Sequence, residues 1–209
     1  MATTILHVDS SPLGEASASR RLTADIVAAL RSAAPGARVL RRDLVAAPLG
    51  HLSGTTLQGW GAADLAALAP EARAEAELSE AVLAEFLAAD ILVVGAPMYN
   101  FSVPSQLKAW IDRVVRAGRS FRYSDKGPVG LATGKRAIIA SSRGGAYSGD
   151  AGRQALDHQE AYLRTVLGFV GIADVAVVRA EGLAMGEAAR AAALAAAARD
   201  IAGLAPVAA

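Results

Sequence analysis

The 209-residue sequence contains no cysteine, which excludes disulfides, cysteine-ligated metals and thiol catalysis. It also has no excess of charge of either sign, because 21 Lys and Arg residues are matched by 20 Asp and Glu residues. A net charge of +1 argues against a nucleic-acid-binding protein, which would carry a basic stripe or face. We therefore expect no nucleic-acid partner.

Long apolar runs are missing as well. No run approaches the roughly 20 residues that a membrane span needs, and the start of the chain lacks the basic and apolar regions of a signal peptide. The three histidines share no metal-ligand spacing, so we expect no bound metal. These absences predict a cytoplasmic protein that has no membrane partner.

The residues that are present predict an α/β protein. A hydrophobic content of 53% suffices for the core of a single domain over residues 1–209. Strand-like runs alternate with helical spacing: strands are predicted at 4–8, 37–40, 91–95, 137–140 and 175–178, and helices at 19–30, 71–87, 104–115, 159–170 and 187–201. Five such alternations predict a doubly wound parallel sheet with helices on both faces.

Two stretches are longer than plain connections between strands and helices, and such insertions are usually functional or disordered. Residues 46–70 carry Trp60, which either reaches the site of a partner subunit or packs under its own long loop. Residues 119–133 contain Phe121-Arg122-Tyr123 and are expected to form a hairpin or flap on the same side of the sheet as the loop after the third strand.

Hydroxyl groups cluster after the first predicted strand. Ser11 leaves that strand, and Ser17-Ala18-Ser19 lies where the next helix begins. A helix N-terminus offers unpaired N–H groups and partial positive charge, so a phosphate can bind there. Ordinary helix capping by serine is the alternative, and both interpretations stay open. Because no G-x-G-x-x-G motif is present, a terminal phosphate is favoured over a pyrophosphate.

Two further loops carry groups suited to a flat ligand. Met98-Tyr99-Asn100-Phe101 follows the most apolar strand and places aromatic and amide groups together. Ser142-Arg143-Gly144-Gly145 follows the fourth strand, and its glycines permit close approach of the backbone to a ligand, although glycine pairs are also common in plain turns. With the strand order 2-1-3-4-5, all three loops meet at the carboxyl edge of the sheet.

These segments, together with Gln106-Leu107-Lys108, Arg116-Ala117-Gly118, Phe121-Arg122-Tyr123 and residues 167–172, resemble the FMN-dependent NADH:azoreductase family. The resemblance runs in order from the first strand to the last. It implies a flavodoxin-like homodimer with one FMN per subunit near the dimer interface. It also implies NADH or NADPH as electron donor, and quinones and aromatic azo compounds as acceptors.

The resemblance also assigns the site. Ser11, Ser17, Ala18 and Ser19 match the residues that hold the FMN phosphate. The residues that match those around the flavin ring are Met98, Tyr99, Asn100, Phe101, Ser142, Arg143, Gly144 and Gly145. No catalytic side chain is assigned, because the flavin itself carries the hydride.

The acceptor site is less well defined. We expect Phe101, Tyr123 and Phe169 to form an aromatic wall around the acceptor, although a phenylalanine at the position of Phe169 is more often part of the core. Tyr147 lies in a region that is more variable among relatives. Asp157 and Glu160 are one helical turn apart and are expected on an exposed helix face.

Two other functions remain open at this point. A flavodoxin-type electron carrier would bind FMN but would have no site for a hydride donor, and such carriers are typically acidic, unlike this chain. A flavin-free protein with the same fold would bind another phosphate or a protein partner.

Overall fold

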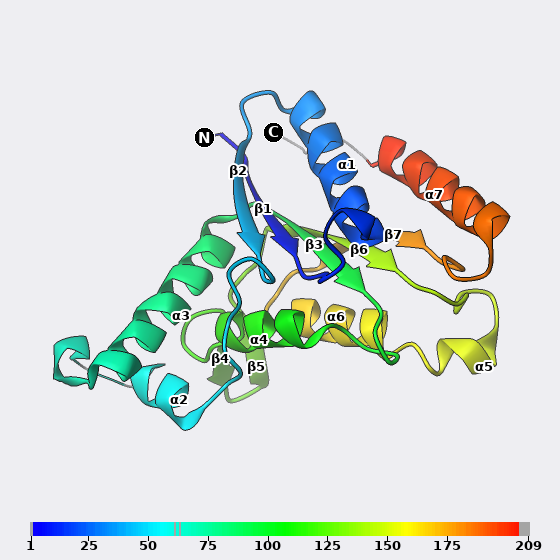
Figure 1. Cartoon of the computed structure of the whole chain (residues 1–209). Coiled ribbons are helices and arrows are strands. Elements are labelled where there is room, and N and C mark those ends of the chain that lie inside the picture. The colour runs from blue at the N-terminus through cyan, green and yellow to red at the C-terminus, as the bar shows by residue number, and fades with distance from the viewer. Residues whose placement is uncertain (1, 61, 63, 205–209) are drawn as a thin grey trace.

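A computed structural model describes residues 2–60, 62 and 64–204. Its centre is a five-stranded parallel sheet in the order β2-β1-β3-β6-β7 (Figure 1). The strands are β1 (Thr4–Asp9), β2 (Arg38–Asp43), β3 (Ile91–Pro97), β6 (Arg136–Ser142) and β7 (Asp174–Ala180). Since β4 and β5 form a separate hairpin, this order is the predicted 2-1-3-4-5, and the doubly wound fold is confirmed.

Helices cover both faces of the sheet (Figure 1). On one face lie α1 (Ala18–Ala33) and α7 (Glu187–Ala202); on the other lie α3 (Pro70–Ala88), α4 (Ser105–Val114) and α6 (His158–Phe169). Successive strand residues point to opposite faces, so Leu92 joins one buried cluster and Val93 the other. This two-sided burial explains why β3 reads as a continuous apolar run. No helix within the described ranges is both long and apolar enough to span a membrane.

The stretch 46–70 contains a helix that its composition did not reveal. Helix α2 (Gly54–Trp60) is followed by the short 3-10 helix η2 (Leu65–Ala67). A Cβ at Gly59 would lie 2.8 Å from the Cβ of Ala76 on α3, so glycine permits the two helices to approach closely. The Arg116 guanidinium lies 4.9 Å from the centroid of the Trp60 ring, so Trp60 packs within its own chain. Residues 61 and 63 of this stretch lie outside the described residues.

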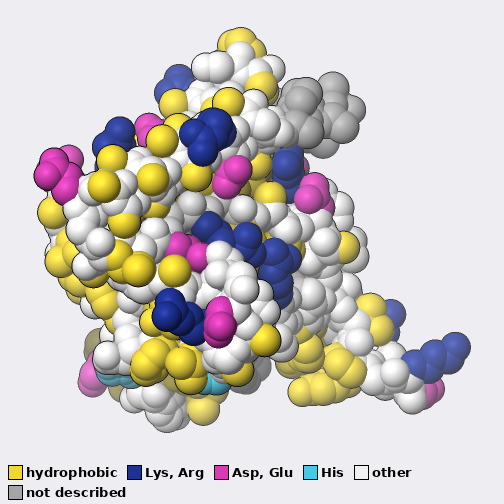
Figure 2. Space-filling view, turned by 90° about the vertical axis from the view of Figure 1, so that its right-hand side faces the viewer, with side chains coloured by type: hydrophobic (Ala, Val, Ile, Leu, Met, Phe, Trp, Pro, Cys, Tyr) yellow, Lys and Arg dark blue, Asp and Glu magenta, His cyan; other side chains and the backbone are white. Residues whose placement is uncertain are grey.

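Residues 119–133 form the predicted hairpin, with β4 (Phe121–Ser124) antiparallel to β5 (Gly127–Gly130). Figure 2 shows it as an arm at the lower right with hydrophobic side chains along it and charged side chains at its end. Its base is fixed to the end of α6, where the Ala132 N–H donates to the Val170 carbonyl at 2.8 Å. A Cβ at Gly130 would lie 2.2 Å from the Gly171 nitrogen, so this contact requires glycine.

The sequence predicts the hairpin on the same side of the sheet as the loop after the third strand, but the structure places the hairpin and this loop at opposite ends of α6. The start of α6, not its end, contacts that loop, because the His158 N–H donates to the Phe101 carbonyl at 3.1 Å. At 1.5 Å per residue, the end of α6 lies about 16 Å further along the helix. The hairpin is therefore remote from Phe101 within one chain. Hydrophobic patterning does not show which helix end an insertion packs against.

Candidate functional site

The three predicted loops share one edge of the sheet. Strands β1, β3 and β6 are neighbours and parallel, so their carboxyl ends lie side by side. The Met98 N–H donates to the Ser142 carbonyl at 2.8 Å, which joins the second loop to the third. The Ser10 hydroxyl donates to the Gly95 carbonyl at 2.6 Å, which joins the first loop to β3. This edge is where doubly wound folds bind ligands.

The first loop gathers three buried hydroxyls at the start of α1. Ser17 caps the helix, and its Oγ accepts from the Arg20 N–H at 3.3 Å and lies 3.1 Å from the Oγ of Ser19. Ser11, at the exit of β1, accepts from the Leu13 N–H at 3.3 Å. The first N–H groups of a helix have no partner within it, so the start of α1 supplies both backbone and hydroxyl donors. This donor set suits a phosphate.

Arg20, which sequence reasoning missed, fixes this loop. Its Nε donates to the Ser11 carbonyl at 2.9 Å, and its two terminal nitrogens donate to the Asp43 carboxylate at 2.6 and 2.8 Å. The hydrogen bond from Arg20 holds the pKa of Asp43 well below its usual range, and the same bond raises the pKa of Arg20. The ion pair therefore joins the first loop, between β1 and α1, to the end of β2. Its sequence signal was an arginine in the first turn after Ser17.

The second loop is a strained tight turn. Tyr99 and Ser102 exchange two backbone hydrogen bonds of 3.0 Å, with Asn100 and Phe101 at the tip. Both tip residues have positive φ, 48° and 70°, as a type I′ turn requires. Asparagine tolerates this region, whereas a phenylalanine there stores about 1–3 kcal/mol of strain. Such strain is common at ligand sites, and the Phe101 side chain is 46% exposed at the edge.

The third loop and the start of α6 bury two charged side chains, Arg143 and Glu160. The Arg143 side chain does not extend to the edge: it is 2% exposed, and its guanidinium lies 2.7 Å from Asp157 and 2.8 Å from Glu181, and also pairs with Glu160. Its backbone is also engaged within the chain, because the Arg143 N–H donates to the Ala180 carbonyl at 2.9 Å and the Arg143 carbonyl accepts from the Leu183 N–H at 3.1 Å. Glu160 is only 6% exposed, so its predicted place on an exposed helix face is wrong. Periodicity could not reveal a buried arginine that recruits carboxylates.

The expected aromatic wall is not assembled within one chain. Phe101 contacts Tyr147, with ring centroids 6.5 Å apart. Phe169 instead packs on Phe121 at 4.6 Å, and Phe121 contacts Tyr123 at 5.4 Å. The structure therefore brings Phe101 together with Tyr147, and Phe169 together with the hairpin.

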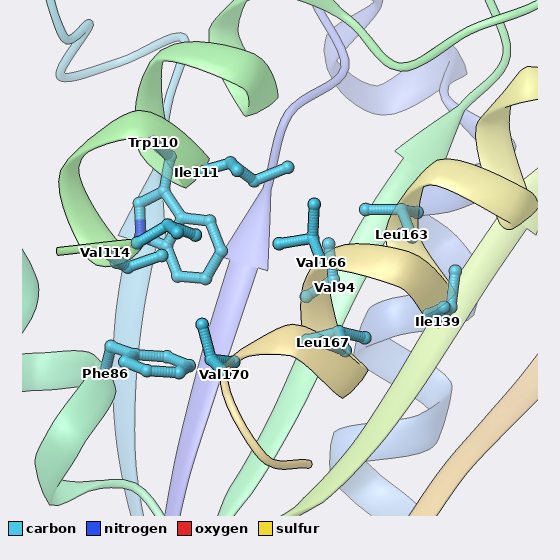
Figure 3. A pocket seen from close by; sticks show the side chains of 11 residues that line it. Phe86, Val94, Trp110, Ile111, Val114, Ile139, Leu163, Val166, Leu167 and Val170 are labelled. Carbon is cyan, nitrogen blue, oxygen red and sulfur yellow. The ribbon is translucent and has the colours of Figure 1, made fainter. Parts of the chain in front are cut away.

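The structure has a small buried cavity and a larger surface groove. An apolar cavity between α4 and α6 (Figure 3) is lined by side chains such as Trp110, Val114 and Leu163, and its volume of about 10 Å³ has room for roughly one water. A groove of about 580 Å³ runs along α1 and the β1–β2 side of the sheet, and Arg20, Arg31 and Arg41 line it together with other residues. It touches the first loop but not the other two. Within the described residues, no group of His, Asp and Glu side chains is arranged to hold a metal.

Comparison with known proteins decides the family. A family model described as having a flavodoxin-like fold matches residues 3–204. The chain is 61% identical over 206 residues to the FMN-dependent NADH:quinone oxidoreductase of Azospirillum brasilense, covering 98% of this chain and 99% of that one. The chain belongs to the FMN-dependent NADH:quinone oxidoreductase family. The predicted family is therefore confirmed.

Other members and neighbours agree with this assignment. The FMN-dependent NADH:quinone oxidoreductase of Methylocella silvestris is 58% identical over 192 residues, covering 91% of this chain and 93% of that one. Among solved structures, an azoreductase from Bacillus anthracis str. Sterne superposes with a TM-score of 0.86 at 27% identity, covering 97% of this chain and 98% of that one. The azoreductase resemblance thus extends to the three-dimensional structure.

For an FMN-dependent NADH:quinone oxidoreductase, the donor set at this edge fits the cofactor. The three buried hydroxyls at the start of α1 suit a phosphomonoester, which is the form of phosphate that FMN carries. The turn at Asn100 and Phe101 and the glycines 144 and 145 lie on the neighbouring strand ends, where a flat ring system has access to backbone N–H groups. The first loop has no pyrophosphate motif that would favour a dinucleotide.

Proposed function

We propose that this chain is a single FMN-binding domain over residues 1–209 that passes a hydride from NADH to quinones and to aromatic azo compounds in a ping-pong sequence. Bound FMN supplies the redox chemistry, since a flavin takes up two electrons from a nicotinamide and gives them to an acceptor. The observation that carries the proposal is the meeting of the three loops at one edge, in a chain 61% identical to an FMN-dependent NADH:quinone oxidoreductase.

The chain's own residues bind FMN, orient it and stabilise the charge that develops on its ring. Ser11, Ser17, Ala18 and Ser19 hold the phosphate through hydroxyls and the N–H groups of α1. The N–H groups at the tip of the Asn100–Phe101 turn, and those of Gly144 and Gly145, would be available to the flavin ring of bound FMN and would stabilise negative charge that develops on it. Backbone dipoles fixed in advance need no reorganisation during reduction, which is why no acidic or basic side chain is required.

We also propose that the enzyme is a homodimer and that the hairpin completes the acceptor site of the partner subunit. Tyr123 is 73% exposed on the arm, and Val129 and Leu131 are exposed beside it. Exposed large apolar side chains on a projecting arm are typical of association surfaces. Since Tyr123 and Phe169 are remote from Phe101 within one chain, a second copy is the means of joining them into one wall. The cytoplasmic location stays a prediction.

Steady-state kinetics test the proposal. FMN-loaded protein should oxidise NADH continuously with a quinone such as menadione, and double-reciprocal plots at several quinone concentrations should be parallel lines. Intersecting lines contradict the ping-pong sequence. Protein that holds FMN but does not oxidise NADH supports the alternative of a flavodoxin-type electron carrier, whereas absence of FMN binding contradicts both.

A further inference from the structure

The carboxylate of Glu181 fixes the loop that carries Gly144 and Gly145. Glu181 directly follows the last residue of β7, so it lies at the carboxyl edge beside that loop. One of its oxygens accepts from the N–H groups of Tyr147 and Ser148, each at 3.3 Å. The other accepts from the Ser148 N–H at 3.2 Å and from the Ser148 hydroxyl. Donors from two consecutive residues therefore converge on one carboxylate.

Backbone hydrogen bonds join the same two segments. The donor and acceptor pairs are Gly182 N–H to Gly145 carbonyl at 2.9 Å, Leu183 N–H to Arg143 carbonyl at 3.1 Å and Ala184 N–H to Gly144 carbonyl at 3.0 Å. Since these bonds use the carbonyls of residues 143–145, the backbone groups that the glycines retain for a ligand are their N–H groups. The side chain of Glu181 extends these hydrogen bonds between the two segments to residues 147 and 148.

Glu181 also belongs to the buried charge cluster beneath the loop. Arg143 is shared by Glu181, Asp157 and Glu160, and Glu160 in turn pairs with Arg179 at 2.7 Å. Burial acts to raise the pKa of Glu181, but hydrogen bonds from Ser148 and the charge of Arg143 outweigh it and lower the pKa. The carboxylate therefore remains ionised at neutral pH, when its hydrogen bonds are strongest.

The fixed segment places the ring of Tyr147. The Arg143 guanidinium lies 5.7 Å from the centroid of that ring, and the ring meets Phe101 edge to face at 6.5 Å. Tyr147 thus spans from the third loop to the strained turn of the second. A side chain held there borders the space over the edge where an acceptor must enter.

We infer that Glu181 is a positioning residue that fixes Tyr147 as a wall of the acceptor site, and that this wall determines which acceptors fit. The inference rests on the proposed function for its acceptor. The loop geometry behind it does not depend on any ligand.

Glu181→Gln is the appropriate variant. It keeps the size of the side chain but removes its charge and replaces one acceptor oxygen by an NH₂ donor, so the Ser148 N–H keeps one acceptor oxygen of the two and the Ser148 hydroxyl loses its charged acceptor. The buried cluster of three carboxylates and two guanidiniums loses one carboxylate and keeps both guanidiniums. Arg143 still pairs with Asp157 and Glu160, so it is not left as an unpaired buried charge. Glu77→Gln, the same change at an exposed position of α3, is the matched control.

Two measurements decide the inference. In FMN-free protein, hydrogen exchange at the amides of Tyr147 and Ser148 should become about tenfold faster in Glu181→Gln, because the charged acceptor of both N–H groups is replaced by a weaker neutral one. In FMN-loaded protein, the ratio of kcat/KM between a one-ring quinone and a bulky azo dye should shift at least about threefold. Glu77→Gln should change neither quantity.

If hydrogen exchange at Tyr147 and Ser148 is unchanged in Glu181→Gln, Glu181 does not fix this segment. If exchange is faster but the ratio of kcat/KM between the two acceptors is unchanged, Glu181 has no role in acceptor specificity. Wild-type protein that reduces no acceptor would contradict the proposed function. The exchange experiment would still show whether Glu181 fixes the segment with Tyr147 and Ser148. If Glu181→Gln does not fold, Ser148→Ala replaces it, since it removes one donor and leaves every charge in place. It should shift both quantities in the same direction by a smaller factor, and no shift overturns the inference.

Discussion

The rings of Phe101 and Tyr147 meet edge to face at an interplanar angle of 85°, although they belong to loops after different strands. The contact joins the strained turn at the end of β3 to the loop that Glu181 holds at the end of β6. Between these loops and the start of α1 lies the edge to which we assign the flavin.

The strain in the turn predicts opposite effects on stability and function. Phe101→Gly should raise the melting temperature of the FMN-free protein by about 2–4 °C, because glycine adopts positive φ without cost and about 1 kcal/mol of strain is released. It should also weaken acceptor binding, because the ring is lost. Asn100→Gly is the matched control, since it adds a glycine to the same turn and keeps the ring. Thermal unfolding and KM for menadione measure the two effects; a less stable Phe101→Gly protein would contradict the predicted gain, because losing the ring contact with Tyr147 would then cost more than the released strain.

If the three buried hydroxyls at the start of α1 hold the FMN phosphate, Ser17→Asp should repel FMN without unfolding α1. Aspartate is itself a good N-cap, so the helix should remain capped, while its charge lies against the phosphate. We expect the Kd for FMN, measured by flavin fluorescence, to rise at least about 100-fold with unchanged helicity. Ser53→Asp is the control, because the Ser53 hydroxyl accepts from the Thr56 N–H at 3.2 Å and caps α2 away from the edge. Wild-type affinity in Ser17→Asp would place the phosphate elsewhere.

The ion pair of Asp43 with Arg20 predicts a pH-dependent contribution to stability. Because the hydrogen bond from Arg20 lowers the pKa of Asp43 in the folded state, the contribution is fully present above the unfolded pKa of about 3.9 and is lost as the pH falls toward the folded pKa. Asp43→Asn should therefore lower the free energy of unfolding at pH 7, and its difference from wild type should shrink below about pH 5. Urea unfolding at several pH values measures this. Asp125→Asn, at the exposed hairpin tip, is the control variant, and a constant difference for Asp43→Asn would contradict the assignment.

If the hairpin forms the interface of the proposed dimer, a single charged residue on it should prevent association. Leu131→Asp should convert the proposed dimer to a monomer, because the charge would be buried in an apolar interface. Light scattering coupled to size-exclusion chromatography measures the mass, and quinone reduction should fall with dimer content. Leu57→Asp, which changes an exposed leucine on α2, is the control. A wild-type monomer, or a dimer that tolerates Leu131→Asp, contradicts the proposed role of the arm.

Sequence patterning predicted the five sheet strands and the main helices because their burial is periodic along the chain. It missed α2, whose short Gly- and Thr-containing segment lacks a clear apolar face, although Gly59 and Ala76 allow it to pack. It also did not reveal that the Arg143 side chain lies among Asp157, Glu160 and Glu181. These partners are 14 to 38 residues away in sequence, and only the folded structure brings them to one place.

Anaerobic reduction of the FMN-loaded protein tests the central claim most directly. One equivalent of NADH should bleach the flavin absorbance completely, and a subsequent equivalent of menadione should restore it with no NADH present. This result would show that donor and acceptor react in separate half-reactions at one bound flavin. Flavin that stays oxidised in the presence of NADH, or that is reduced but not reoxidised by menadione, would contradict the account.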